Sequence, residues 1–352
     1  MEKLEKIAGR FAVEGKVGCI KPLGQGFIND TYFVIMEGES SPRYILQRKN
    51  HLVFPDVPAM MDNIERVTAH IKTRVKDPLR ETLTVIPTLD GRLCLQDEDG
   101  NWWAMCLYIT GSSSYDQAST PELARQGGLG LGSFHRLVSD FNGPLAEVIK
   151  GFHNMRWRFE QWDASIARDA AGRVASLAEE ISWVESRRER VMELWKLVED
   201  GTLPSRVTHN DTKISNFLFD AADGRLLCAI DLDTLMRSTV LNDVGDALRS
   251  YTNTGAEDER DLSRVSMSRE MYDAYMDGYL SVMEAYLCEA EKRYLPYSGC
   301  LITFEQVLRF LMDYIDGDVY YKTAYPEHNL VRTRAQYRLL ESMEEQLGVA
   351  RP

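Results

Sequence analysis

The chain has 352 residues, of which 44% are hydrophobic, and a formal net charge of −13 at pH 7. This length is sufficient for two lobes, and this hydrophobic content excludes an intrinsically disordered protein. The acidic balance argues against nucleic acid or an anionic membrane as a partner, because binding to phosphate groups requires a basic face.

The sequence favours a protein of the reducing cytoplasm. Its first six residues are mostly charged, and no apolar run reaches the length of a membrane-spanning helix. The six cysteines are scattered and form no C-x-x-C pair. Because Cys19, Cys106 and Cys228 lie in apolar, strand-like runs, we expect these thiols to be buried. We also expect no membrane partner and a cytoplasmic location.

Near the N-terminus, a glycine-containing turn joins two strand-like runs. Gly24 and Gly26 permit positive φ angles, which lets backbone N–H groups approach phosphate oxygens. A G-x-G sequence alone is usually only a hairpin turn. Its place ahead of the Asp/Asn motif described below makes the loop a candidate nucleotide site, to which we also assign Asn29. No G-x-x-x-x-G-K-S/T sequence occurs, which argues against a P-loop NTPase.

The run from residue 43 to 49 predicts a strand at the place where kinases carry a phosphate-binding lysine. Apolar alternation puts Gln47 at the lysine position, and of the adjacent Arg48 and Lys49 only one can share its face. A helix is predicted over residues 61–70, with Glu65 as a possible partner for a basic residue. The group that neutralises the α- and β-phosphates therefore stays open.

Strand patterns continue to about residue 108. We predict strands over residues 83–89 and 93–96, on either side of an Asp90-Gly91 turn, and a buried strand over 102–109. The small polar residues 110–114 are a candidate hinge, where adenine could bond to the backbone near Tyr108. Helical patterns prevail from residue 121, first over 121–141 and then over about 160–200.

The strongest functional signal is an ordered set of Asp and Asn residues. Asp211 and Asn216 stand in the pattern H-x-D-x-x-x-x-N, close to the catalytic loop of protein kinases, and Asp231 follows a predicted β-hairpin. A carboxylate at position 211 can orient or deprotonate an attacking hydroxyl. The oxygens of Asn216 and Asp231 suit a hard cation that also binds phosphates. Each residue alone is more often a cap or turn residue, but the ordered set favours magnesium-assisted phosphoryl transfer from ATP.

Two later segments carry candidate substrate residues. Asp243 and Asp246 are typical of the acidic first turn of a helix, and Arg249 either pairs with Asp246 or contacts the substrate. Residues 310–321 mix aromatic side chains with carboxylates, as sugar sites do, although tyrosines at helical spacing more often belong to a core.

These motifs together resemble those of bacterial N-acetylhexosamine 1-kinases, members of the aminoglycoside phosphotransferase-like, protein-kinase-like superfamily. The resemblance runs nearly end to end, and its segments are residues 11–15, 44–47, 209–216, 230–234, 242–249 and 325–334. Relatives tolerate glutamine at position 47, and they often carry histidine where this chain has Phe27. Phenylalanine cannot hydrogen-bond to a phosphate or a sugar, so sugar preference is expected to differ here.

The resemblance implies a bilobal α+β fold, with an N-terminal antiparallel-sheet lobe over residues 1–108 and a mainly helical catalytic and sugar-binding lobe over 109–352. It also implies Asp211 as catalytic base and Mg²⁺ ligands at Asn216 and Asp231. Our own candidates for nucleotide binding, from the patterns described above, are Gly24, Gly26, Asn29, Gln47 and Tyr108. The implied sugar contacts are Thr234, Arg249, Arg309 and Tyr320.

The activity expected from this resemblance is ATP-dependent phosphorylation of N-acetylglucosamine or N-acetylgalactosamine at O1. Three alternatives remain. One is a kinase of the same fold for an aminoglycoside, another amino-sugar hydroxyl or N-acetylmuramate. The second is a catalytically silent nucleotide-binding protein, suggested by the missing lysine at position 47. The third is a metal-dependent hydrolase, for which the sequence offers no recognisable nucleophile motif.

Overall fold

The computed structural model describes residues 2–24, 28–38 and 41–348. It divides into two compact units, each assembled from separate segments of the chain. The first unit comprises Met1–Tyr115, Phe134–Lys150 and Ser215–Met236, and the second comprises Asp116–Ser133, Gly151–Ile214 and Arg237–Pro352.

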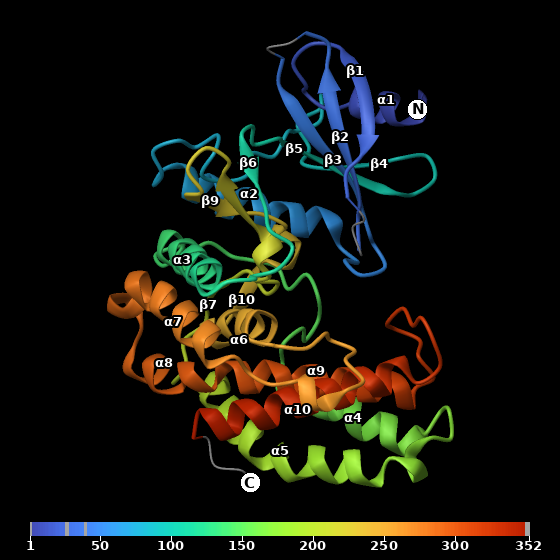
Figure 1. Ribbon diagram of the computed structural model, residues 1–352. Helices are drawn as coiled ribbons and strands as arrows, with labels where there is room; N and C mark the ends of the chain where they lie inside the picture. The colour runs from blue at the N-terminus through green and yellow to red at the C-terminus, as the bar shows by residue number, and fades with distance from the viewer. Residues whose placement is uncertain (1, 25–27, 39–40, 349–352) are drawn as a thin grey trace. The chain divides into compact units, whose positions relative to one another are not determined.

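A five-stranded antiparallel sheet forms the N-terminal part of the first unit (Figure 1). Its strands lie in the order β1 (Val17–Pro22), β2 (Asp30–Met36), β3 (Arg43–Lys49), β5 (Trp102–Leu107) and β4 (Leu95–Gln96). In this register, Gln47 of β3 lies opposite Thr31 of β2 and Ala104 of β5. The antiparallel pairing confirms the predicted sheet.

The strand predicted over residues 83–89 is wrong. This segment makes only isolated bridges, which join Val85 to Cys106 and Thr88 to Phe11. Pro87 has no N–H group to donate, so a continuous ladder cannot form here. Of the strand predicted over residues 93–96, only Leu95–Gln96 pairs as a strand.

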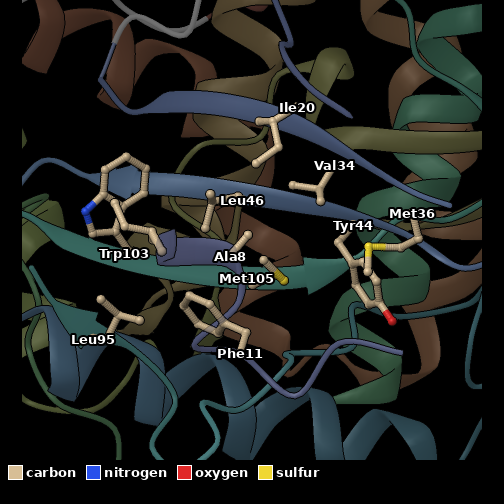
Figure 2. Close-up of a cluster of buried hydrophobic side chains, with 11 residues drawn as sticks. Ala8, Phe11, Ile20, Val34, Met36, Tyr44, Leu46, Leu95, Trp103 and Met105 are labelled. Atoms are coloured by element: carbon tan, nitrogen blue, oxygen red, sulfur yellow. The ribbon is translucent and has the colours of Figure 1, made fainter. Parts of the chain in front are cut away.

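One face of the five-stranded sheet carries a hydrophobic core (Figure 2). Its buried side chains include Leu46 of β3, and they pack with Phe11 and with helix α1 (Glu2–Ala8). Side chains alternate along a strand, so Gln47 and Lys49 face away from the side on which Leu46 lies. The core therefore places Gln47 and Lys49 together on the opposite face of β3.

The first unit also contains a helix and a smaller sheet. The three strands of this sheet lie in the order β6 (Ser112–Ser113), β8 (Phe217–Asp220) and β9 (Leu226–Ala229). The β8–β9 pair confirms the predicted hairpin. Helix α2 (Val57–Lys72) begins earlier than the predicted 61–70 because Asp56 caps it, accepting a hydrogen bond from the Ala59 N–H, and Pro58 suits the first turn.

The second unit is mainly helical. Its helices are α4 (Met155–Arg168), α5 (Ala178–Glu199), α6 (Val240–Tyr251), α7 (Arg269–Met283), α8 (Glu289–Tyr294), α9 (Ser298–Ile315) and α10 (His328–Gln346), and it contains strand β7 (Arg206–Thr208). Short 3-10 helices cover Val174–Ser176, Leu262–Arg264, Glu284–Tyr286 and Leu295–Tyr297. Helix α3 (Pro121–Leu137) and strand β10 (Met236–Ser238) include residues of both units.

The predicted helical regions are confirmed with different limits. The helix predicted over 121–141 ends at Leu137, and the helical region predicted over 160–200 consists of α4 and α5. Asp169 separates these two helices, because its left-handed φ of 40° ends α4.

Helix α9 is buried along almost its whole length and packs against α4, α6 and α10. Its contact with α6 is close, since a Cβ atom on Gly245 would lie 2.3 Å from the carbonyl oxygen of Ser298. Among the described residues, no helix has both the length and the apolar composition needed to cross a membrane. The antiparallel sheet and the helical part together confirm the predicted α+β fold class.

Candidate active site

The β8–β9 hairpin holds both predicted metal ligands at its open end. Asn216 ends the 3-10 helix η2 (Ile214–Asn216) directly before β8, and Asp231 follows the last residues of β9. Phe217 and Ala229 are paired across the hairpin, and the Ile230 N–H donates to the Asn216 carbonyl oxygen at 2.8 Å. The hairpin thus brings the backbone of Asn216 next to that of the residue preceding Asp231.

Asp231 adopts a left-handed backbone conformation, with φ 56° and ψ 53°. This conformation is uncommon for residues other than glycine, although Asp and Asn tolerate it best. It turns the chain into the 3-10 helix η3 (Leu232–Thr234), whose residues are buried, while Asp231 itself is exposed. An exposed carboxylate beside an Asn position offers anionic and neutral oxygen donors, which suit Mg²⁺.

A buried ion pair in the first unit was missed by the sequence analysis. The ammonium nitrogen of Lys49 lies 2.7 and 2.9 Å from the two carboxylate oxygens of Asp233, and the two side chains are 3% and 6% exposed. Lys49 also donates to Gln47 Oε1 at 2.7 Å, and Asn29 Nδ2 donates to Asp233 Oδ2 at 2.7 Å. A positive charge therefore lies beside Gln47, the residue that aligns with the phosphate-binding lysine of kinases.

The choice between Arg48 and Lys49 follows from the strand geometry. Arg48 lies on the same side of β3 as Leu46, but near the end of the strand, where its exposed side chain pairs with Asp30; Lys49 lies on the side of Gln47. Glu65 was predicted as a possible partner for a basic residue of this strand, but the carboxylate that pairs with Lys49 is that of Asp233. Because side chains alternate between the two faces of a strand, the sequence indicates that Lys49 shares the face of Gln47. No signal near Lys49 or Asp233 in the sequence indicates that the two residues pair.

The remaining predicted nucleotide residues are distributed along the first unit. Gly24 has a φ of +67°, and a Cβ there would have no heavy atom within 4 Å, so its positive φ rather than crowding favours glycine. Gly26 and Phe27 lie outside the described residues. Gln47 Nε2 donates to Thr31 Oγ1 at 3.2 Å. The Tyr108 N–H donates to the Arg43 carbonyl at 2.9 Å, so this amide is already used within the sheet.

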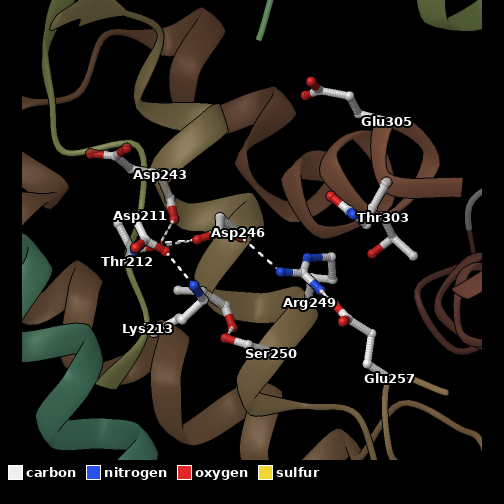
Figure 3. A network of polar contacts seen from close by, with 12 residues as sticks. Asp211, Thr212, Lys213, Asp243, Asp246, Arg249, Ser250, Glu257, Thr303 and Glu305 are labelled. Atoms are coloured by element: carbon white, nitrogen blue, oxygen red, sulfur yellow. Dashed lines mark hydrogen bonds and ion pairs between the residues drawn. The ribbon is translucent and has the colours of Figure 1, made fainter. Parts of the chain in front are cut away.

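The predicted catalytic residue Asp211 belongs to the second unit, in a loop that helix α6 holds in place (Figure 3). The backbone N–H groups of His209 and Asn210 donate to the two carboxylate oxygens of Asp243, each at 2.7 Å. The Thr212 N–H donates to Asp246 Oδ2 at 3.0 Å. Asp243 lies in the first turn of α6 as predicted, but its carboxylate serves the loop rather than only the helix dipole. The same prediction is wrong for Asp246, which lies beyond the first turn.

The carboxylate of Asp211 itself is partly exposed. Its side chain is 27% exposed and lies 2.9 Å from the ammonium nitrogen of Lys213. The loop residues on either side of it are buried. The arrangement can present one carboxylate oxygen to an incoming hydroxyl group while the backbone of the loop stays fixed.

Arg249 forms the ion pair that was one of its two predicted roles. It lies 3.1 Å from Asp246 and 3.3 Å from Glu257, and its side chain is 11% exposed. Burial acts to raise the pKa of Asp246, but the charges of Arg249 and Lys213 outweigh this effect and hold the pKa below its usual value. Asp246 is therefore ionised when it accepts the Thr212 amide.

The other predicted sugar residues of the second unit, Arg309 and Tyr320, lie near Phe152 and Tyr321, and we call these four residues the aromatic–arginine cluster. The guanidinium carbon of Arg309 lies 5.7 Å from the ring centre of Phe152, 5.8 Å from that of Tyr320 and 5.5 Å from that of Tyr321. Tyr320 is 63% exposed. Thr234, the remaining predicted sugar residue, belongs to η3 of the first unit and is buried.

Glu305, one turn before Arg309, anchors a buried group of ionisable side chains. It lies 2.7 Å from His153 and 3.0 Å from Arg158. Burial acts to raise the pKa of Glu305, but His153 and Arg158 outweigh it and lower this pKa to about 2. The sequence analysis did not find this group, because Glu305 is 152 residues from His153 and 147 from Arg158.

Known structures with the same fold cover nearly the whole chain. A microcompartment-associated aminopropanol kinase is 18% identical with a TM-score of 0.66, covering 100% of this chain and 99% of its own. Spectinomycin phosphotransferase APH(9)-Ia, solved with ADP and spectinomycin, is 14% identical with a TM-score of 0.61, covering 99% and 98%. Amicoumacin kinase hAmiN, solved with AMP-PNP, Ca²⁺ and Ami, is 14% identical with a TM-score of 0.61, covering 98% and 93%.

The family assignment rests on the sequence itself. Residues 20–289 match the family model APH, described as the phosphotransferase enzyme family. The matched range contains the glycine turn, Lys49, the Asp/Asn motif and helix α6, and it is well over half of the chain. This protein is a member of the phosphotransferase enzyme family.

Proposed function

We propose that the protein is an ATP-dependent kinase that phosphorylates N-acetylglucosamine or N-acetylgalactosamine at the anomeric hydroxyl, giving a hexosamine 1-phosphate and ADP. The observation that carries the reaction class is the Asp211 loop, whose backbone is fixed by two carboxylates of α6. The choice of sugar rests on the resemblance of the sequence motifs to N-acetylhexosamine 1-kinases and on the aromatic–arginine cluster.

The first unit supplies the residues for the phosphoryl donor. In this proposal Asn216 and Asp231 would hold Mg²⁺, which would neutralise charge on the phosphates. The glycine turn offers backbone N–H groups, and Lys49 adds a positive charge beside Gln47. The alternative of a catalytically silent nucleotide-binding protein was suggested by the absence of a lysine at position 47. The positive charge of Lys49 beside Gln47 weakens that alternative.

The second unit supplies the acceptor chemistry. Asp211 orients the anomeric O–H and accepts its proton as the oxygen attacks the γ-phosphorus in line, forming the O1–P bond while the bond from that phosphorus to the β-phosphate oxygen breaks. An anomeric hydroxyl is more acidic than an ordinary alcohol, so a modest base suffices. Positioning is the main contribution of the protein, because the loop is held by hydrogen bonds before the substrate arrives.

The test is ADP release with Mg-ATP and a panel of N-acetylhexosamines, hexoses, aminoglycosides and amino alcohols, with phosphorus NMR on any product. We expect an anomeric phosphate on an N-acetylhexosamine. A phosphate on any other hydroxyl, or turnover only with another class of acceptor, would refute the substrate assignment while leaving the reaction class intact.

The role of Asp211 is tested by Asp211→Asn, which we expect to lower kcat by roughly two to four orders of magnitude with little change in ATP affinity. The control is Asp223→Asn, because Asp223 lies in the exposed loop of the β8–β9 hairpin and its carboxylate accepts only a local amide. Near-wild-type turnover of the Asp211 variant would mean that another group accepts the proton.

A further inference from the structure

The short loop that follows α9 presents two residues of the aromatic–arginine cluster. Gly317 and Asp318 both have left-handed backbone angles, with φ of 97° and 61°, and reverse the chain sharply. Val319 and Tyr320 then lie exposed, at 78% and 63%. An exposed loop with a tyrosine at its tip is usually mobile, so what holds this loop matters for any ligand that meets Tyr320.

One buried carboxylate holds the loop. Asp313, 5% exposed, accepts hydrogen bonds through Oδ1 from the N–H groups of Val319 at 2.9 Å and Tyr320 at 2.7 Å, and through Oδ2 from that of Tyr321 at 2.9 Å. Three successive backbone amides therefore converge on one anionic group. Its own carbonyl oxygen accepts the N–H of Asp318 at 2.7 Å.

A second set of contacts keeps Asp313 and the loop together. Asn329 of α10 donates through Nδ2 to Asp313 Oδ2 at 2.8 Å and to Asp318 Oδ1 at 2.9 Å. Arg173 donates to Asp318 Oδ2 at 2.7 Å and to the Tyr314 carbonyl at 2.6 Å. The carboxylate of Asp313, itself on α9, thus has partners on helix α10 and in the loop.

The position of Asp313 in helix α9 is unfavourable for a carboxylate that has no other partners. It lies in the last turn of α9, where the helix dipole disfavours negative charge, and it is removed from water. The loop amides offset both costs, since charge-assisted hydrogen bonds are the strong ones. The result is a loop whose backbone is fixed while the Tyr320 ring stays exposed.

We infer that Asp313 is a positioning residue for acceptor binding, acting through Tyr320 and Tyr321. The two rings lie 4.8 Å apart in an edge-on arrangement, and Arg309 is near both. These two rings and the guanidinium group form what we call the tyrosine–arginine wall. Such a wall fits a carbohydrate, because the apolar C–H face of a sugar packs on an aromatic ring and its oxygen atoms accept hydrogen bonds from a guanidinium group. Holding the wall rigid before binding lowers the entropic cost of association. This inference rests on the proposed function, because it assigns the wall to the acceptor.

The experiment compares Asp313→Asn with Asp316→Asn. Asp316 lies just after α9 and pairs with Ser165 at 2.7 Å and Arg168 at 2.6 Å, but not with the loop amides. Both variants lose one carboxylate from the same helix end. We expect Asp313→Asn to raise the acceptor KM at least about tenfold, equivalent to about 1.4 kcal/mol, with the ATP KM changed by less than about twofold. Asp316→Asn is expected to leave both constants near wild type.

A second variant guards against loss of folding. Asp318→Asn keeps a residue type that accepts a left-handed φ but loses the charge paired with Arg173, so we expect a smaller rise in acceptor KM. Amide hydrogen exchange of residues 316–322 is expected to accelerate in the Asp313 variant and not in the Asp316 variant. Equal acceptor KM values for the Asp313 and Asp316 variants, whatever acceptor the panel identifies, would overturn the inference. The KM comparison uses whichever acceptor the panel identifies. Its result is therefore independent of whether NMR shows the product to be an anomeric phosphate.

Discussion

Replacing Lys49 by methionine removes one charge of a buried pair and leaves the other in place. The Lys49 and Asp233 side chains are 3% and 6% exposed, and their closest atoms are 2.7 Å apart. Removing one partner of such a pair costs about 3–5 kcal/mol, because the remaining carboxylate is buried without its countercharge. Methionine keeps the unbranched stem, so little packing is lost, and Asn29 still donates to Asp233. We therefore expect a cost near the lower end of this range.

The measurement is thermal and urea unfolding of wild type, Lys49→Met and a matched control, Arg48→Met. Arg48 is the next residue on the same strand, and its pair with Asp30 is about half exposed, at 45% and 46%. An exposed pair contributes at most about 1 kcal/mol. For the first unit, a loss of about 3 kcal/mol lowers Tm by on the order of 10 °C, whereas the control is expected to shift it by only a few degrees.

The double variant Lys49→Met with Asp233→Asn separates the charge effect from packing. Because it removes the stranded charge, it is expected to recover part of the stability that Lys49→Met alone loses. If Lys49→Met and Arg48→Met cost the same, the pair is not buried in solution and the argument from β3 alternation fails.

Two further predictions concern the second unit. Asp243→Ala removes the carboxylate that accepts hydrogen bonds from the His209 and Asn210 amides. We therefore expect kcat to fall by on the order of tenfold to a hundredfold, with the ATP KM little changed. An unchanged kcat in steady-state assays would show that the loop holds its shape without this carboxylate. The pKa of Glu305 is lowered from 4.5 to about 2, so its contribution to stability is complete above pH 4.5 and is lost as the pH falls from there toward 2. Urea unfolding of wild type and Glu305→Gln across that interval tests this, since the wild type is expected to lose about 3 kcal/mol more than the variant, and parallel pH dependences would contradict it.

The parts of the fold that sequence analysis predicted depend on local signals. Apolar alternation marks β2 and β3, a turn between two apolar runs marks the β8–β9 hairpin, and helical periodicity marks α3. The errors are also local in origin. Pro87 interrupts a run that has the composition of a strand. Asp169 divides a helical region because it adopts a left-handed φ, which its sequence context does not reveal.

The partners of the candidate site residues could not be predicted in the same way. Spacing alone identified Asp211, Asn216 and Asp231 as a set, because their order is itself the signal. The groups that hold such residues come from elsewhere in the chain. Asp243 is 34 residues from His209, whose amide it accepts, and its acidic first-turn position had a sufficient local explanation. A residue with a plausible local role conceals its tertiary role in a single sequence.

The Lys49–Asp233 pair has a consequence for the newly made chain. The two residues are 184 positions apart. At a synthesis rate of roughly 5–20 residues per second, Asp233 is added about ten to forty seconds after Lys49. Through that interval the strands of the N-terminal sheet can pair, yet the ammonium group of Lys49 has no carboxylate to accompany it into the interior and stays in water. The first unit can therefore close around this lysine only after translation has passed residue 233.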